Sequence, residues 1–422
     1  MIDGQRVAVS LTPVPLDSDS RAFRFAQMLA EDGYRSIVIE GRPSGRRFWN
    51  ASIEVRSVRR TRVGEIRPGS ILRSGRLRNA VRVMRQGRMG TAGEAMLYLG
   101  YRAHDWWRYC RQPLSVIPPA ELYVLHSFEF YRAIAPLARR LGARILYDAH
   151  DFYRGIESVE QKAAFDRNRL DPFLRRLEEK LILQADAVTT VSGGIAELIS
   201  LTFGRRPDVI RNCHDERLDS ANVRPLRTTL GLGESDRLAV VVGNYKAGLA
   251  IHTAAAALQQ LPQHVHLAFL GRGYEEVATK LPSDLVGRRL HLGLVAAPNE
   301  IVPLIRTADV GLVLYEPRSE NYRFALPNGF FQLVAAGLPI VRGELQEVEA
   351  AIGDCAIGYC LPKLEPAAIA RAISRTIAER DALRTNVAAL ACSLRWEYEV
   401  TKLRPLIDLA SAPAASARLD LQ

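Results

Sequence analysis

Apolar residues in the first half of the chain fall into short runs, separated by longer segments in which apolar and polar residues recur at helical spacing. The short runs have the length of buried strands, and they are Val7–Leu11, Ser36–Glu40, Leu122–His126, Arg144–Asp148 and Ala187–Val191. The longer segments predict helices at Arg21–Asp32, Tyr131–Leu141, Pro172–Gln184 and Gly193–Ser200, with Gly142 as a C-cap and Ser192 as an N-cap. Strands that alternate with helices predict a parallel, doubly wound sheet.

A second alternating set follows a polar and irregular segment. Its apolar runs predict strands at Leu238–Val242, Val265–Leu270, Leu290–Leu292 and Val310–Leu314. Its helical segments are Leu249–Gln260, Pro298–Ala308, a helix that opens at Pro327–Asn328 and stops at Gly337, Pro366–Thr385 and Trp396–Leu409. We therefore predict an α/β fold with two Rossmann-like, doubly wound domains that face each other across a cleft.

The length of 422 residues agrees with two domains rather than one core. We place an N-terminal domain at 1–215, a linker at 216–236 and a C-terminal domain at 237–395. A last helix at 396–410 is expected to pack back on the N-terminal domain, and 411–422 to be a disordered tail. No apolar run approaches the length of a bilayer-spanning helix, and the N-terminal stretch lacks a signal-peptide core. The five scattered cysteines favour reduced, buried thiols, so we expect a cytoplasmic protein.

The net charge of +11 is unevenly placed along the chain. The stretch Arg56–Arg88 holds eleven Arg and a single acidic residue, Glu65. Part of it, Ile71–Met89, predicts a helix with apolar residues among its Arg residues, which suits the surface of an anionic membrane. A solvated surface is the alternative. No nucleic acid partner is expected, because no recognition motif or pattern of stacking aromatics accompanies the charge.

Glycine follows three consecutive predicted strands of the second set, at Gly243, at Gly271 and Gly273, and at Gly293. Glycine at a strand-to-helix turn lets the backbone approach a phosphate or a nucleobase without a Cβ between them. Each turn alone is explained by ordinary turn chemistry, but turns at successive strand ends would share one crevice. Lys246 and Arg323 are the cations best placed to meet a diphosphate, and the helix opened by Asn328 could add N–H donors.

Six segments, in the order usual for one family, carry a specific resemblance. They are DSDSRAFRFAQMLAEDGYRSIVIEG (17–41), YVLHSFEFYRAIAPLARRLGARILYDAHDFY (123–153), LEEKLILQADAVTTVSGGIAELI (177–199), VIRNCHD (209–215), FLGRGYEE (269–276) and NYRFALPNGFFQLVAAGLPIV (321–341). Together they resemble retaining GT-B glycosyltransferases of the family 4 type.

The resemblance implies transfer of a sugar from a nucleoside diphosphate, UDP or GDP, to a glycan or lipid-linked acceptor, with retention at the anomeric carbon and without a metal or other required cofactor. It implies a catalytic-site role for His150, with Asp19, Arg21, His126 and Asp151 on the acceptor side. The residues that it implies for the sugar donor are Gly243, Asn244, Lys246, Gly271, Gly273, Gly293, Leu294, Arg323, Leu326, Pro327, Asn328 and Gln332. From the residues alone, His150 could instead be a buried structural histidine beside Asp148 or Asp151, and His126 could likewise be structural.

Three positions depart from the family pattern. The family usually places Lys after the Pro–Asn pair and Glu three residues later, where this chain has Gly329 and Gln332. A second family Glu, eight residues before Gln332, is Phe324 here. A Gln side chain can still accept a hydrogen bond from a ribose hydroxyl, but without the charge of a carboxylate.

Three hypotheses follow from these observations. The first is a glycosyltransferase of polysaccharide or glycoconjugate synthesis, acting at the inner face of the cell membrane, which it would contact through Arg56–Arg88. The second, motivated by Gly329 and Gln332, is a GT-B-shaped binding or regulatory protein with weakened catalysis. The third is a nucleic-acid-associated protein, motivated only by the Arg-rich stretch.

Overall fold

The computed structural model describes residues 5–45, 47–58, 107–153, 167–246 and 248–411. The chain divides into two compact units, one of residues 1–149, 161–188 and 407–422, the other of residues 150–160 and 189–406. Each is thus assembled from separate stretches of chain. The predicted helix Ile71–Met89, with most of the Arg-rich stretch, lies outside the described residues, as does the tail from residue 412.

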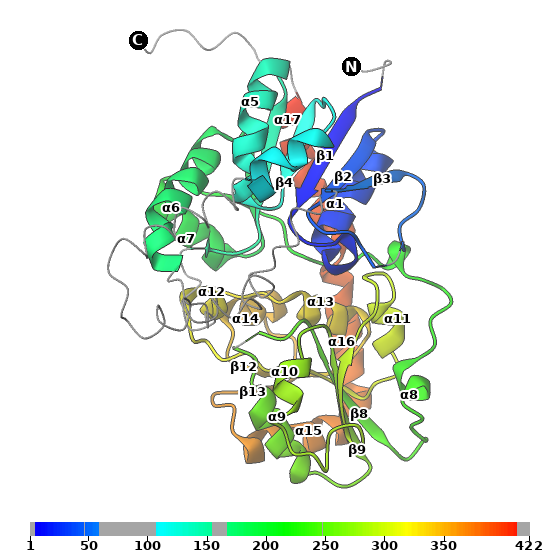
Figure 1. The fold of residues 1–422 in the computed structure, drawn as a ribbon. Helices are drawn as coiled ribbons and strands as arrows, with labels where there is room; N and C mark the ends of the chain where they lie inside the picture. Colours follow the sequence, from blue (N-terminus) through cyan, green and yellow to red (C-terminus); the bar gives the residue numbers. More distant parts are fainter. Residues whose placement is uncertain (1–4, 46, 59–106, 154–166, 247, 412–422) are drawn as a thin grey trace, which may run out of the picture. The chain divides into compact units, whose positions relative to one another are not determined.

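A seven-stranded sheet is built from the first half of the chain (Figure 1). Its strands are β1 Val7–Thr12, β2 Arg35–Glu40, β3 Ile53–Ser57, β4 Leu122–Leu125, β5 Arg144–Ala149, β6 Ala187–Thr190 and β7 Asp208–Val209. The strand order is β3-β2-β1-β4-β5-β6-β7, and the register of β1 runs parallel to β2 from Val7↔Arg35 to Thr12↔Glu40. The five predicted strands are confirmed. β3 and β7 were not predicted, since β3 is mostly polar and half-buried and β7 has two residues.

The helices of this half are α1 Ser20–Glu31, α5 Tyr131–Leu141, α6 Arg167–Gln184 and α7 Gly193–Phe203. All four were predicted, although α6 begins earlier than Pro172. Gly142 adopts the left-handed conformation at the end of α5, with φ of 65°. The Ser192 side chain accepts a hydrogen bond from the Ile195 N–H and caps α7.

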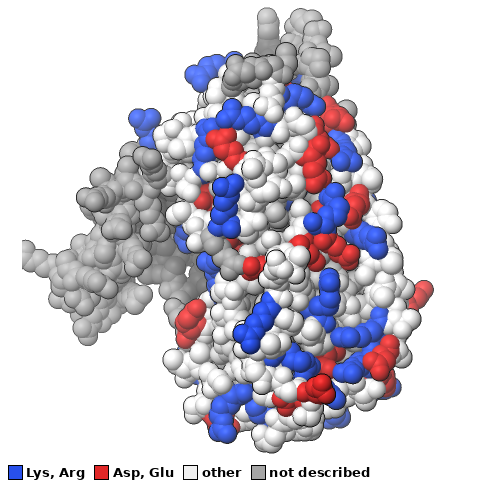
Figure 2. Space-filling model, turned by 90° about the vertical axis from the view of Figure 1, so that its right-hand side faces the viewer, with Lys and Arg blue, Asp and Glu red and all other residues white. Residues whose placement is uncertain are grey.

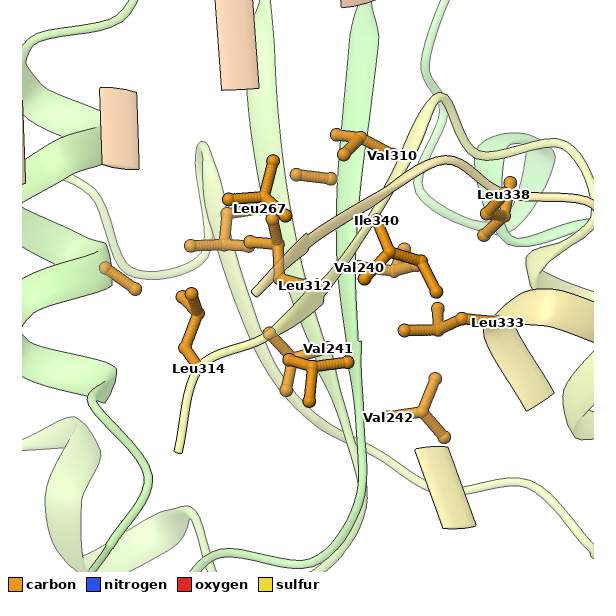
Figure 3. Close-up of a cluster of buried hydrophobic side chains, with 14 of the residues drawn as sticks. Val240, Val241, Val242, Leu267, Val310, Leu312, Leu314, Leu333, Leu338 and Ile340 are labelled. Carbon is orange, nitrogen blue, oxygen red and sulfur yellow. The ribbon is translucent and has the colours of Figure 1, made fainter. Parts of the chain in front are cut away.

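A six-stranded parallel sheet is built from the second half, in the order β10-β9-β8-β11-β12-β13. Its strands are β8 Arg237–Val242, β9 Val265–Leu270, β10 Leu290–Leu294, β11 Val310–Val313, β12 Ile340–Gly343 and β13 Gly358–Leu361. Branched aliphatic side chains of four of these strands pack in the core with Leu333 of helix α13, Asn328–Ala335 (Figure 3). Because both faces of the central strands are covered, these strands read as continuous apolar runs rather than alternating ones.

The helices of this half are α8 Leu226–Thr229, α9 Ile251–Gln259, α10 Glu275–Ala278, α11 Ile301–Ile305, α12 Glu320–Arg323, α13 Asn328–Ala335, α14 Gln346–Ile352, α15 Pro366–Ala378, α16 Arg380–Ser393 and α17 Trp396–Ser411. One group, α9 and α15, packs together against the sheet, while α13 packs on β8 and against α11 and α16. The β8–α9–β9 and β11–α13–β12 crossovers run in opposite directions along the sheet, so right-handed connections put α9 and α13 on opposite faces.

One helix prediction for this half was wrong. The helix expected at Pro366–Thr385 is two helices, because the chain turns at Glu379 and Arg380 begins α16 with its guanidinium 2.6 Å from the Asp309 carboxylate. The expected linker also contains α8, which Arg227 fastens through a 2.7 Å ion pair to the same carboxylate.

Within the described residues, no helix is both long enough and apolar enough to cross a membrane. All five cysteines are free thiols. Cys213 is buried as expected, but Cys392 is exposed, so burial of all the thiols was a wrong prediction. On the face shown in Figure 2, acidic and basic side chains are interspersed over the described part, without a large area of one sign.

Candidate functional site

The order of the second sheet reverses between β8 and β11. From β8 the chain continues to β9 and β10 on one side, and then to β11, β12 and β13 on the other. In open α/β sheets, ligands bind beyond the carboxyl ends of the strands at such a point. The residues that leave β8 and β11 at this edge are Gly243 and, after Leu314, Tyr315.

The turns that follow β8 and β9 are interlocked through their backbones. The Gly243 N–H donates to the Leu270 carbonyl at 2.8 Å, and an ideal Cβ on Gly271 would lie 2.1 Å from the Gly243 carbonyl oxygen. Gly271 has a φ of 147°, so both its space and its conformation require glycine. The Asn244 side chain joins the turns a second time, because its amide oxygen accepts the Arg272 N–H at 2.9 Å.

The end of β10 also contacts the turn that follows β9. We predicted Gly293 in a turn after Leu292, but β10 continues to Leu294 and Gly293 lies inside it with φ of 71°. The register with β9 shifts between His291 and Leu294, as in a β-bulge. The Leu294 carbonyl accepts the Gly271 N–H at 2.8 Å. The predicted glycine positions therefore do lie together.

The Tyr274 side chain connects the turn after β9 to the turn after β8. Gly273, with φ of 87°, turns the chain so that the Tyr274 side chain is buried. Its hydroxyl donates to the Gly243 carbonyl at 2.7 Å. Burial raises the pKa of Tyr274 far above its usual value, so the phenol stays a hydrogen-bond donor. Sequence reasoning missed this residue, because a Tyr after Gly-x-Gly reads equally well as plain core.

Helix α13 begins against the end of β8. Pro327 precedes it in extended conformation, and Leu326 is buried beneath this turn. The exposed Asn328 accepts a hydrogen bond on its side-chain oxygen from the Asn212 amide. An ideal Cβ on Gly329 would lie 2.2 Å from the Val242 carbonyl oxygen, so the backbones are in contact there. Gly329 therefore has no room for the lysine that the family pattern would place at this position.

The remaining residues predicted for the sugar donor differ in exposure. Gln332 is buried on α13. Lys246 and Arg323 are exposed cations, and the Arg323 guanidinium lies 5.4 Å from the centre of the Phe324 ring. An exposed ammonium and guanidinium can meet a phosphate without a large desolvation cost.

Phe324 and Glu347 both meet the beginning of α7. The N–H groups of Gly193 and Gly194 donate to the Glu347 carboxylate at 3.0 and 2.6 Å, and the Ser192 hydroxyl donates to the Phe324 carbonyl at 3.0 Å. The Phe324 ring lies so close to Gly194 that a Cβ there would be 2.1 Å away. The residue that replaces the family Glu thus packs on a glycine, and Glu347 satisfies the helix N-terminus. Sequence reasoning missed Glu347.

In the first unit, polar side chains at the ends of β1, β4 and β5 and at the start of α1 form two buried hydrogen-bonded groups. The Arg21 guanidinium binds the Asp148 carboxylate with two hydrogen bonds of 2.7 Å, and His126 Nδ1 lies 3.0 Å from the same carboxylate. Asp19 caps α1 through the Ala22 N–H at 3.0 Å and accepts the Thr12 hydroxyl at 2.7 Å. Arg21, His126 and Asp148 are almost completely buried. Arg21 and His126 therefore act as buried partners of the Asp148 carboxylate and position the carboxyl ends of β4 and β5.

Asp148 is the member of the first group that sequence reasoning did not assign. The signal was present, because a carboxylate inside an otherwise apolar strand needs a buried cation as its partner.

His150 follows β5 and is half-buried. The next two residues are held by Asn321, whose side-chain amide donates to Asp151 at 3.0 Å and accepts the Phe152 N–H at 3.0 Å. The structure thus brings the predicted residues together in two groups, one at the carboxyl edge of the second sheet and one at the strand ends of the first.

Comparisons with known proteins give structural likeness alone. No protein-family model matches the sequence, and no curated protein sequence matches it. Sucrose-phosphate synthase from Thermosynechococcus elongatus is 16% identical, with a TM-score of 0.62 over 96% of this chain and 98% of that chain. Anabaena HepE, solved in complex with UDP and glucose, is 13% identical, with a TM-score of 0.62 over 96% and 100%. WaaG, a glycosyltransferase involved in lipopolysaccharide biosynthesis, is 14% identical, with a TM-score of 0.61 over 95% and 99%. At these identities the likeness shows a shared fold.

Proposed function

We propose, on the premise that the chain has the GT-B fold, that it transfers a sugar from a nucleoside diphosphate to a glycan acceptor. The donor would bind at the carboxyl edge of the second sheet, at the β8–β11 switch point. Likeness to HepE, a protein solved with UDP and glucose, supports a donor of this class. The family 4 type remains a prediction from the sequence.

The observation that carries this proposal is the interlocked set of glycine turns beside the start of α13. Gly243 and Gly271 bring two backbones together at the switch point, and Gly329 brings the first turn of α13 against β8. A backbone surface without Cβ atoms, next to a helix N-terminus, suits phosphate oxygens. Lys246 and Arg323 would supply positive charge to the diphosphate.

We propose that transfer proceeds with retention and that the protein contributes positioning and charge neutralisation. The diphosphate leaving group would accept the proton of the acceptor hydroxyl as the bond to the anomeric carbon forms. His150 would contact the reacting sugar, and Gln332 the ribose hydroxyls. Arg21 and His126, both buried against Asp148, would hold the strand ends on the acceptor side rather than touch the acceptor. No metal or other cofactor is required by this scheme.

We further propose that the acceptor is lipid-linked and that the chain works at the surface of a membrane. The support is the sequence of Arg56–Arg88, with its eleven Arg residues, and the likeness to WaaG.

Calorimetric titration with UDP, GDP and ADP tests the core of the proposal. We expect one of the three nucleotides to bind with a dissociation constant well below a millimolar, and this would also identify the base. The failure of all three to bind at millimolar concentration would contradict a nucleotide-sugar site.

A second candidate function is binding without transfer, and the contact at Gly329 favours it because the site holds no lysine there. Once the preferred base is known, a transfer assay distinguishes the two candidate functions. Incubation with UDP- or GDP-sugars and a mixture of glycan acceptors should give a product that mass spectrometry detects and NMR identifies as the retained anomer. Nucleotide binding without any sugar release or transfer would favour the second candidate.

A further inference from the structure

We propose that Tyr315 is a residue of the sugar-donor site, and that its hydroxyl donates a hydrogen bond to a phosphate oxygen of the nucleoside diphosphate. The inference rests on the proposed function, and it adds a residue that the family pattern does not include. Tyr315 comes directly after the last apolar residue that follows β11, while Gly243 comes directly after β8. These two strands are the pair between which the sheet order reverses.

The Tyr315 hydroxyl points at the glycine turn. An ideal Cβ on Gly243 would lie 3.2 Å from this oxygen, so no side chain stands between the hydroxyl and the turn backbone. Tyr315 as a whole is only 8% exposed. Among the described residues none forms a hydrogen bond with its hydroxyl, and the oxygen is not one of the fully enclosed polar atoms. A buried phenol usually has a partner, so this hydroxyl is free to meet a ligand.

Neighbouring residues fix the Tyr315 side chain in this direction. Its backbone pairs with Leu249, and the next residue donates its N–H to the Gly248 carbonyl at 2.9 Å. The Tyr315 ring stacks on the Tyr322 ring, with 6.2 Å between their centres and 24° between their planes. The Tyr322 ring in turn lies against Gly248, where a Cβ would be 2.8 Å away. A hydroxyl held in this way loses little freedom when it binds a phosphate.

The charge state of Tyr315 suits donation. Burial raises the pKa of the phenol, and the nearby Lys246 ammonium acts in the opposite direction with a smaller effect. The phenol therefore stays protonated at neutral pH. A neutral hydroxyl and a nearby ammonium could both donate hydrogen bonds to the oxygens of one diphosphate.

Tyr315 would also replace a phosphate contact that position 329 cannot provide. Gly329 is closed to any side chain by the Val242 carbonyl. In this chain a diphosphate contact would be made from the end of β11, beside Gly243, instead of from the first turn of α13.

The test is calorimetric titration of Tyr315→Phe with UDP and, separately, with uridine, which lacks the phosphates; GDP and guanosine or ADP and adenosine replace them if the wild type prefers another base. We expect Tyr315→Phe to bind the diphosphate roughly tenfold more weakly, which is the effect of one hydrogen bond to a charged group. Binding of the nucleoside should not change. Tyr398→Phe is the matched control, because that side chain is 53% exposed, and it should behave as the wild type does.

Each result decides the question. A Tyr315→Phe protein that binds diphosphate as tightly as the wild type overturns this inference and leaves the proposed function standing, as does an equal loss for nucleoside and diphosphate. A wild-type chain that binds no nucleotide overturns both. The variant should fold, since the hydroxyl has no hydrogen-bond partner among the described residues. If it does not fold, Tyr322→Leu is an independent route, because it removes the ring that stacks on Tyr315; it should weaken diphosphate binding but not nucleoside binding, and unchanged diphosphate binding would overturn the inference.

Discussion

At Gly329 the first turn of α13 is so close to β8 that an ideal Cβ would lie 2.2 Å from the Val242 carbonyl oxygen. The neighbouring atom belongs to a strand backbone that cannot swing aside. The lysine that the family pattern favours at this position would therefore clash with the β8 backbone and destabilise the fold. Gly329→Lys should lower the stability of the second unit by about 1–3 kcal/mol.

Thermal unfolding of Gly329→Lys and Gly329→Ala measures this cost. The matched control is Gly233→Ala, where the nearest atom to a new Cβ is 3.7 Å away, at ordinary contact distance. We expect the two Gly329 variants to melt well below the control. A Gly329→Lys protein that melts with the wild type and binds nucleotide more tightly would show that α13 moves aside easily.

The buried Asp148 carboxylate supports a second prediction at the scale of single residues. Asp148→Asn would leave the Arg21 guanidinium buried without its counter-charge, and breaking such a pair costs about 3–5 kcal/mol. Glu54→Gln is the control, because the Glu54–Arg35 ion pair has side chains that are 38% and 46% exposed and should contribute less than about 1 kcal/mol. Urea unfolding would test the difference, and equal midpoints for the two variants would contradict it.

Among the elements, the turns after β8 and β9 are joined by the Tyr274 side chain, which follows the second turn and donates a hydrogen bond to the Gly243 carbonyl of the first. Removing its hydroxyl leaves the Gly243 carbonyl without its 2.7 Å partner. Tyr274→Phe should therefore lower stability by about 1–3 kcal/mol and also weaken nucleotide binding. This sets it apart from Tyr315→Phe, which should weaken binding at unchanged stability. Melting temperature and calorimetric titration on the same samples distinguish the two variants. Unchanged stability of Tyr274→Phe would contradict a stabilising role for the hydrogen bond from Tyr274 to the Gly243 carbonyl.

Strands β9 and β10 carry a histidine pair that should make the fold sensitive to acid. His266 Nδ1 lies 3.3 Å from His291 Nε2, so one of these two nitrogens donates a hydrogen bond to the other while both rings are neutral. Burial, together with the neighbouring His266, lowers the pKa of His291 to about 4. Burial also lowers the pKa of His266; Asp236 acts against this shift, while Arg289 and Arg227 add to it.

The sign of the pH effect follows from these shifts. An unfolded histidine has a pKa of about 6.5, above the folded value, so the unfolded chain takes up protons first as the pH falls. Stability from this pair is complete above about pH 6.5 and is lost progressively toward pH 4. The urea midpoint of the wild type should fall over this range more steeply than that of His291→Leu. His264→Gln, at an exposed position beside the same strand, should keep the wild-type slope.

Much of the alternation of strands and helices could be predicted, because buried parallel strands leave continuous apolar runs such as Val265–Leu270, which is β9 without change. Elements held by partners distant in sequence could not. The break at Glu379 depends on Arg380 reaching Asp309, and the bulge at Gly293 depends on its register with β9. Neither contact leaves a periodic signal.

For the candidate site, glycine positions were predictable and side-chain partners were not. A glycine after a strand is visible in the sequence, but the closeness of Gly271 to Gly243 depends on two strands meeting in one sheet. Tyr315 and Asp148 were missed for the same reason. A Tyr beside apolar residues reads as core, and a carboxylate in an apolar strand indicates a buried cation without identifying it, until the opposing element is known.

At the scale of the whole molecule, the uneven charge of the chain supports a prediction about membranes. The part of one face that Figure 2 shows has both signs interspersed, while Arg56–Arg88 concentrates eleven Arg residues. We expect the protein to float with vesicles that contain anionic lipid at low salt and to be released at high salt. A variant with half of these Arg residues changed to Gln should float less. Failure of the wild type to bind at low salt would contradict membrane contact.

The two units are interleaved along the chain, and this has a consequence for synthesis. The first unit includes residues 1–149 and 161–188 but also residues from 407 onward, where Ile407 is buried. A ribosome delivers those last residues only after the whole of 189–406 has emerged. The first unit therefore cannot be completed before residues 189–406 have been synthesised, and a fragment that ends near residue 215 should remain incomplete although it contains the entire first sheet.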